Sequence, residues 1–188
     1  AYSVLGGNPV FQGRFVDNDW AVSSNGPVGH YRYRLLAPPG RTLRHQLPEG
    51  SELTQRERGA ERETLIQRRR VAQFRWDPYA PGIAMAQDMV QTSEFADWVE
   101  VATWAQGLFH RAIATAGPVV AERAAALKQR SADPAERLRL ALDLVQTEVR
   151  YFGTEVGPYS HQPASVEKVL VQRFGDCKDK SALLVALL

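Results

Sequence analysis

The stretch Arg173–Leu188, RFGDCKDKSALLVALL, contains the one cysteine of the chain and its clearest helix signal. Gly175 permits a tight turn, and Asp176 is a favourable N-cap residue. Asp179 follows three positions later, which is the spacing of a capping box. The pattern therefore predicts a helix that begins at Cys177. The apolar residues that follow predict that this helix is buried on nearly every side.

At the first position of that helix, Cys177 would lie beside unpaired backbone N–H groups and the positive end of the helix dipole. This setting favours the thiolate, which is the nucleophilic form of cysteine. The same N–H groups can form part of an oxyanion hole, and Lys178 and Lys180 add positive potential. The alternative is that Cys177 is a small, inert core residue, which is common for a free cysteine.

Composition limits the classes of protein that need to be considered. The 188 residues are enough for one sizeable domain or two small ones, and the net charge of +2 argues against a dedicated nucleic-acid binder. No apolar run is long enough for a transmembrane helix. A single cysteine excludes an internal disulfide and a cysteine-based zinc site. The start of the chain has no signal-peptide pattern and suggests a cut end.

The first half of the chain shows the rhythm of β-strands. In residues 30–40, HYRYRLLAPPG, apolar and arginine side chains alternate before a Pro-Pro-Gly turn, and residues 43–47 alternate in the same way. Residues 61–76 contain two further short runs with the pattern of strands. The second run places three side chains on one face: Ala72, Phe74 and Trp76. We expect an antiparallel sheet or sandwich over residues 1–92.

From Ser93 onward the apolar period becomes helical, with Ser93 as the expected N-cap. Six apolar residues fall at helical spacings: Phe95, Trp98, Val99, Ala102, Ala105 and Phe109. The aromatic residues at 95, 98, 104 and 109 are expected to be core, with a ligand platform as the alternative. A second helix runs to about Arg130, a third follows the N-cap Asp133, and a short one follows Ser165. With a helical region over residues 93–188, the expected fold class is α+β.

The segment around Cys177 resembles the nucleophile segment of bacterial transglutaminase-like proteins, a branch of the papain-like cysteine enzymes. Residues 149–170, VRYFGTEVGPYSHQPASVEKVL, are similar to the run-in to that segment. Residues 93–109 and the β region before them resemble a domain of unassigned function that precedes such cores. The resemblance covers residues 20–188. It implies a β domain followed by the helical first part of a transglutaminase-like core, with Cys177 as nucleophile.

The resemblance also implies an activity: attack on a peptide or carboxamide bond through a cysteine thioester. Such chemistry needs no metal or organic cofactor, so we expect none. Transfer to an amine would be transglutaminase chemistry, and transfer to water would be protease or amidase chemistry. The family uses a Cys-His-Asp arrangement whose His and Asp follow the nucleophile helix. We therefore expect a C-terminally truncated, inactive fragment of an extracytoplasmic bacterial enzyme with a protein or peptide substrate. The alternative is a non-catalytic binding or scaffold module with a vestigial core.

Two further residues are candidates for the site. His161 could be a polar residue of the cleft or a substitute base, and Gln162 could supply a second oxyanion donor. The other histidines are expected to be structural or solvated: His30, His45 and His110.

Two surface features complete the expectations. The basic run of residues 68–70 is expected to be the solvated part of a hairpin, with an anionic-polymer site as the alternative. The apolar helix at residues 177–188 would expose a patch through which the chain could form a homo-oligomer.

Overall fold

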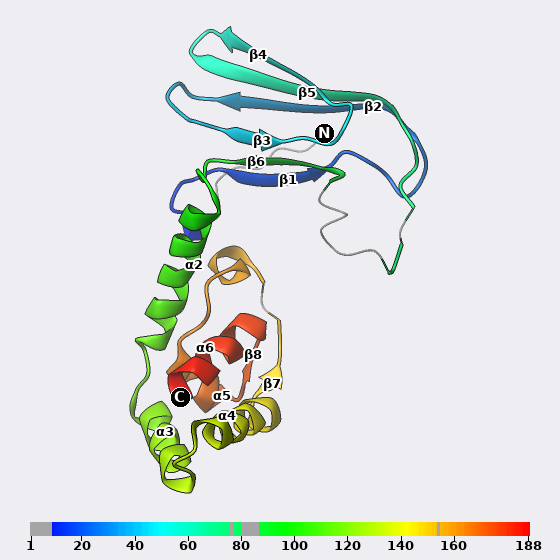
Figure 1. Cartoon of the computed structure of the whole chain (residues 1–188). Coiled ribbons are helices and arrows are strands. Elements are labelled where there is room, and N and C mark those ends of the chain that lie inside the picture. The colour runs from blue at the N-terminus through cyan, green and yellow to red at the C-terminus, as the bar shows by residue number, and fades with distance from the viewer. Residues whose placement is uncertain (1–8, 76, 80–86, 154) are drawn as a thin grey trace. The chain divides into compact units, whose positions relative to one another are not determined.

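The structure, a computed structural model, describes residues 9–75, 77–79, 87–153 and 155–188 (Figure 1). Its contacts divide the chain into a strand unit, Arg14–Ala96, and a helical unit, Asp97–Leu188. Residues 9–13 belong to the helical unit. Antiparallel sheets precede a helical region, so the predicted α+β class is confirmed. Trp76, expected on a strand face, lies outside the described residues.

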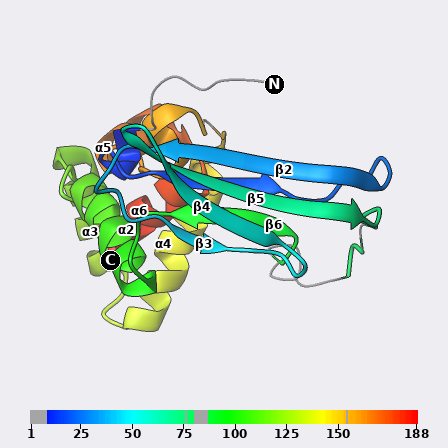
Figure 2. The same ribbon diagram turned by 90° about the horizontal axis from the view of Figure 1, so that it is seen from above.

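The strand unit contains two antiparallel sheets of three strands each. The first sheet has the order β1 (Val16–Trp20), β6 (Met89–Ser93), β3 (Arg44–Gln46). The second has the order β2 (Val28–Ala37), β5 (Glu61–Val71), β4 (Glu52–Arg58), and Figure 2 shows β5 between its two neighbours.

A small core joins these two sheets. Its buried members are Ala21, Ile66 and Val90. Two tyrosines of β2 also reach across to β1: Tyr31 donates to Asp19 at 2.6 Å, and Tyr33 donates to Asp17 at 2.8 Å. Burial, together with these carboxylates, raises the pKa of both phenols well above the ordinary value, so both remain donors.

The prediction of two short strands in residues 61–76 is wrong. One strand, β5, runs from Glu61 to Val71, and residues 72–75 are not in a strand. The strand is long because it is paired on both sides, and it ends where the partner strand β2 begins, with Val28 opposite Val71. The basic run 68–70 lies inside β5 near its end, and Arg69 and Arg70 are exposed there, as expected for a solvated run.

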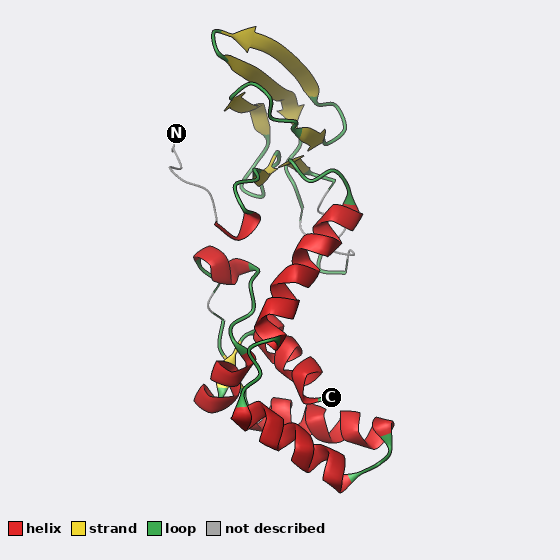
Figure 3. Cartoon of the chain, turned by 90° about the vertical axis from the view of Figure 1, so that its left-hand side faces the viewer, coloured by secondary structure: helices red, strands yellow, loops and turns green. Residues whose placement is uncertain are grey.

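The helical unit, whose helices are red in Figure 3, contains five α-helices among the described residues. They are α2 (Trp98–Ile113), α3 (Pro118–Arg130), α4 (Pro134–Glu148), α5 (Val166–Gln172) and α6 (Cys177–Leu187). Short 3-10 helices are η1 (Pro9–Phe11) and η2 (Gly157–Ser160), and β7 (Arg150–Tyr151) pairs in parallel with β8 (Phe174–Gly175). Within the described ranges, none of the helices has the length and hydropathy needed to span a bilayer.

The start of α2 differs from the prediction. Its N-cap is Asp97, whose carboxylate accepts from Glu100 N at 2.8 Å, whereas Ser93 ends β6. Trp98 is 84% exposed, so its assignment to the core is wrong, and the neighbouring Val99 is 73% exposed. They lie in the first turn, and the face that is buried appears only later in the helix.

The last helix is less enclosed than its composition predicts. It packs against α2, α3, α4 and α5, which bury Ala182, Leu183 and Leu187. Val185 and Leu188 are exposed, so a narrow apolar stripe remains on one side. Association of two copies through this helix stays a prediction, with this stripe as the surface available for it.

Candidate active site

Cys177 is the first residue of α6, and its side chain is exposed. Asp176 accepts hydrogen bonds from Lys178 N at 3.1 Å and Asp179 N at 3.3 Å, and Asp179 accepts from Asp176 N at 3.0 Å. The predicted helix start and capping box are therefore confirmed. Among the described residues, neither the N–H nor the Sγ of Cys177 has a hydrogen-bond partner.

This capping pattern has a chemical consequence. The cap occupies the N–H groups of the second and third helical residues and leaves that of Cys177 available. An N–H next to the sulfur is in a position to donate to the oxygen of an acyl group bonded to that sulfur. The arrangement can therefore supply a thiol and one oxyanion donor from the same residue.

Gly175 is required for a reason other than the predicted turn. It lies in β8, and its φ is outside the left-handed region. A Cβ at this position would come within 2.8 Å of Asp179 Cβ and 3.3 Å of Val169 Cγ1. The close approach of β8 to α5 and α6 thus demands glycine immediately before the capping residue.

The two lysines after Cys177 have structural partners. Lys178 forms an ion pair with the buried carboxylate of Asp176. Lys180 Nζ donates to Val149 O at 2.5 Å, which joins α6 to the end of α4. The predicted positive potential is therefore reduced at Lys178 by Asp176, while Lys180 mainly holds the helix in place.

Tyr151 is a site residue that the sequence did not reveal. The β7–β8 pairing places it opposite Gly175, and Phe152 N donates to Gly175 O at 2.9 Å. The charge of Cys177 is the largest cause that raises the Tyr151 pKa, followed by burial, and Lys178 acts in the opposite direction. The phenol is therefore protonated near neutral pH and lies within electrostatic range of the thiol.

His161 lies in the loop after η2, and its ring packs against two aromatic rings. The ring centroids of Phe11 and Trp104 are 5.1 Å and 5.5 Å away, and Nδ1 shares a hydrogen bond with Ser160 Oγ at 2.8 Å. Burial, followed by the charge of Lys178, lowers the pKa of His161. The imidazole is therefore neutral near pH 7.

The same loop is fixed to the start of α6. Ala164 N donates to Asp179 Oδ1 at 2.7 Å, and Gln162 N donates to Pro158 O at 2.9 Å. Within the part of the chain that is described, no hydrogen bond joins His161 or Gln162 to Cys177. Their roles as base and oxyanion donor therefore remain proposals.

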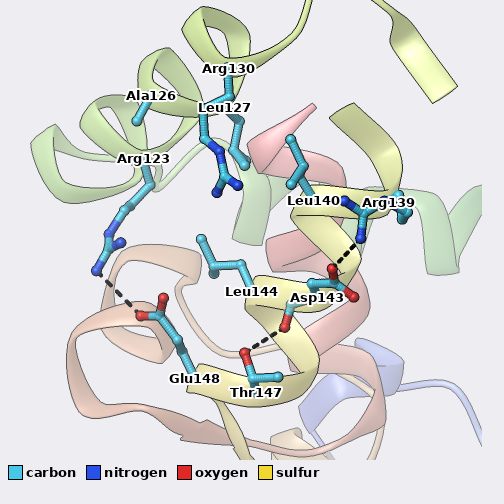
Figure 4. Close-up of a pocket in the computed structure, with 10 residues that line it drawn as sticks. All are labelled: Arg123, Ala126, Leu127, Arg130, Arg139, Leu140, Asp143, Leu144, Thr147 and Glu148. Carbon is cyan, nitrogen blue, oxygen red and sulfur yellow. Dashed lines mark hydrogen bonds and ion pairs between the residues drawn. The ribbon is translucent and has the colours of Figure 1, made fainter. Parts of the chain in front are cut away.

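A separate cavity of about 310 Å³ lies between α3 and α4 (Figure 4). Its charged side chains are largely paired: Arg123 with Glu148 at 3.3 Å, and Arg139 with Asp143 at 2.7 Å. Cys177 does not line it. In the described ranges there is also no cluster of three or more His, Cys, Asp or Glu side chains that could hold a metal ion.

Comparisons with known proteins bear on both units. Residues 1–81 match DUF3857, described as a domain of unknown function with a solved structure. A solved structure from Parabacteroides distasonis, described as a "putative protease", is similar in fold, with a TM-score of 0.76 and 13% identity over 93% of this chain. The chain spans only 34% of that protein's length. No curated protein matches.

Proposed function

We propose that this chain is the nucleophile-bearing part of a transglutaminase-like cysteine enzyme that cleaves or transfers at peptide or carboxamide bonds. The observation that carries the proposal is the exposed Cys177 at the capped start of α6, with its own N–H unoccupied. The fold similarity to a protein described as a "putative protease" supports it. In the same proposal, residues 1–92 form the accessory β domain and residues 93–188 the first part of the catalytic core.

The chemistry has two steps. The thiolate of Cys177 attacks the carbonyl carbon, an S–C bond forms, and the C–N bond breaks as the amine leaves with a proton from a general acid. Water or a second amine then attacks the thioester and releases the sulfur. The backbone N–H of Cys177 stabilises the oxyanion in both steps, and the neutral phenol of Tyr151 is our candidate for a further donor.

The general acid and base of the proposal is a histidine, with an aspartate that orients it, as the family resemblance implies. Both would follow α6 in the full-length protein. His161 is the weaker candidate because its Nδ1 is shared with Ser160 and its ring is packed against Phe11 and Trp104. Gln162 remains a candidate for an amide donor.

Alkylation of the single cysteine tests the nucleophile directly. With iodoacetamide near neutral pH, we expect the folded chain to react about tenfold faster than the same chain unfolded in urea, because only the folded state places the sulfur at a helix N-terminus. The unfolded chain is a matched control with the same single thiol. An equal or slower rate in the folded chain would refute the activated thiol.

A non-catalytic binding module is the second candidate, since His161 contacts Ser160, Phe11 and Trp104 rather than Cys177. Turnover assays with peptide and glutamine-containing substrates separate the two. We expect no turnover from the 188-residue chain alone, and turnover from the full-length protein that Cys177→Ala abolishes. A full-length protein that reacts at Cys177 without turnover would favour the module.

A further inference from the structure

Three arginines converge on one buried carboxylate in the strand unit. Glu63 lies on the face of β5 opposite to Ile66, so it points away from the core between the sheets. It is nevertheless only 1% exposed. Arg34 of β2 and Arg56 of β4 each donate Nε to it, and Arg58 Nη1 lies 3.5 Å away.

Glu63 remains ionised beneath these guanidinium groups. The hydrogen bonds from Arg56 and then Arg34 lower its pKa to about 2. One negative charge therefore faces three positive charges, and the cluster carries a net charge of +2. The surplus positive charge is fixed in place because the carboxylate on β5 orients arginines from the two strands that flank it, β2 and β4.

Most of the donors in this cluster remain available. A guanidinium has five N–H donors, and each of the three arginines gives one nitrogen to Glu63. Among the described residues, the other nitrogens have no partner. The side chains of Arg56 and Arg58 are 67% and 59% exposed, so these donors are open to solvent.

We propose that Arg34, Arg56 and Arg58 form a binding site for a phosphate group, either free or in the headgroup of a lipid. A tetrahedral dianion matches the net charge of the cluster and can accept from several guanidinium groups at once. Glu63 holds these groups in position before the ligand arrives, which reduces the ordering cost of binding. This site is independent of Cys177 and of the proposed enzyme activity.

Phosphate titration of the full chain tests the site. Inorganic phosphate is added at constant ionic strength, and the Nε–Hε signals of ¹⁵N-labelled arginines are followed by NMR. We expect saturable shifts in Arg34 and Arg56, and about fivefold weaker binding in Arg58→Gln, which removes one guanidinium but leaves Glu63 paired. Arg62→Gln is the matched control, since Arg62 is exposed on the same hairpin but pairs with Glu57.

A second arm distinguishes the source of the phosphate. Vesicles of phosphatidylcholine with phosphatidate are compared with vesicles of phosphatidylcholine alone. Saturable binding of inorganic phosphate supports a free ligand, and binding only to phosphatidate vesicles supports a headgroup, provided that Arg58→Gln weakens it and Arg62→Gln does not. Absence of both kinds of binding, or equal weakening by the two variants, would overturn the proposal.

Discussion

Tyr151 and Cys177 share one electrostatic environment at the start of α6, and this coupling can be measured. A negative sulfur disfavours ionisation of a nearby phenol, so it raises the phenol pKa. We predict that Cys177→Ala lowers the Tyr151 pKa toward its ordinary value, because the largest cause of the shift is removed. NMR of tyrosine labelled with ¹³C at Cζ, recorded against pH, gives this value directly.

Tyr33 serves as the internal control for that titration. Its pKa is raised by burial and by Asp17, not by the cysteine, so it should be unchanged in Cys177→Ala. A Tyr151 pKa that does not move would mean that the phenol and the sulfur are not neighbours in solution.

Single residues were predictable from sequence where their interactions are local. The helix start at Cys177 depends on Asp176 and Asp179, which lie within one turn of it, and that prediction was correct. The position of Tyr151 depends on the pairing of β7 with β8, two strands of two residues each. Strands this short have no measurable period, so the sequence could not place Tyr151 beside the cysteine.

Among the helices, α2 and α6 both begin with an aspartate cap, but the two caps differ in burial. Asp176 is 1% exposed and bonds two backbone N–H groups and Lys178, whereas Asp97 is exposed and bonds Glu100 N. We predict that Asp176→Ala lowers the free energy of unfolding by about 2 kcal/mol and Asp97→Ala by about 1 kcal/mol or less. Urea unfolding followed by the helical circular dichroism signal measures both, and equal losses would contradict the role assigned to burial.

The N-terminus of α3 is capped from a distance by Glu167 of α5. Its carboxylate accepts from Gly117 N at 3.0 Å, Val119 N at 2.9 Å and Val120 N at 3.1 Å. Burial alone would raise the pKa of Glu167, but these three N–H groups outweigh it, and the pKa is lowered. The ionised form therefore stabilises the folded state, and this stabilisation is present above the unfolded pKa of about 4.3.

We accordingly predict that Glu167→Gln lowers the melting temperature by about 3 °C near neutral pH. The difference from the unsubstituted chain should shrink as the pH falls through the lowered pKa, because both proteins are then uncharged at this position. Thermal melts at a series of pH values provide the test. Glu122→Gln is the control, because it removes one carboxylate from the exposed surface of the same helix α3 and leaves the Glu167 cap intact.

Helix positions were predicted better than helix faces. Asp133 and Pro134 begin α4 as predicted, because caps are read from adjacent residues. The apolar spacing of this region predicts a buried stripe of Leu138, Ala141, Leu142, Val145 and Val149. Three of these residues are buried, but Leu138 and Leu142 are exposed and Leu140 is buried instead. Apolar residues surround much of this helix, and only the neighbours that pack against it decide which of them are covered.

At the scale of the whole molecule, residues 9–13 contact the helical unit although the strand unit follows them in sequence. Phe11 stacks on Trp104 with ring centroids 5.4 Å apart, and Trp104 Nε1 donates to Val10 O at 2.8 Å. We predict that Phe11→Ala destabilises the helical unit by about 2 kcal/mol. Amide hydrogen exchange should accelerate in α2 and around His161 and remain unchanged in β2 and β5.

Exchange that accelerates equally in β2 and β5 would show that the two units unfold together.

The proposed boundary between residues 92 and 93 came from the change of apolar period, which describes how elements form. The apolar period could not indicate that residues 9–13 pack against α2, because aromatic packing between distant segments leaves no periodic signal.

The distant cap of α3 also bears on the order in which the protein can be made. Glu167 follows Gly117 by fifty positions, so a ribosome completes α3 well before the side chain that caps it has been synthesised. During that interval the first N–H groups of α3 can bond only to water, and the helix lacks its stabilising anion. The helical unit can therefore complete its folding only late in synthesis. By then α5 has emerged from the ribosome, and the carboxylate of Glu167 can cap the start of α3.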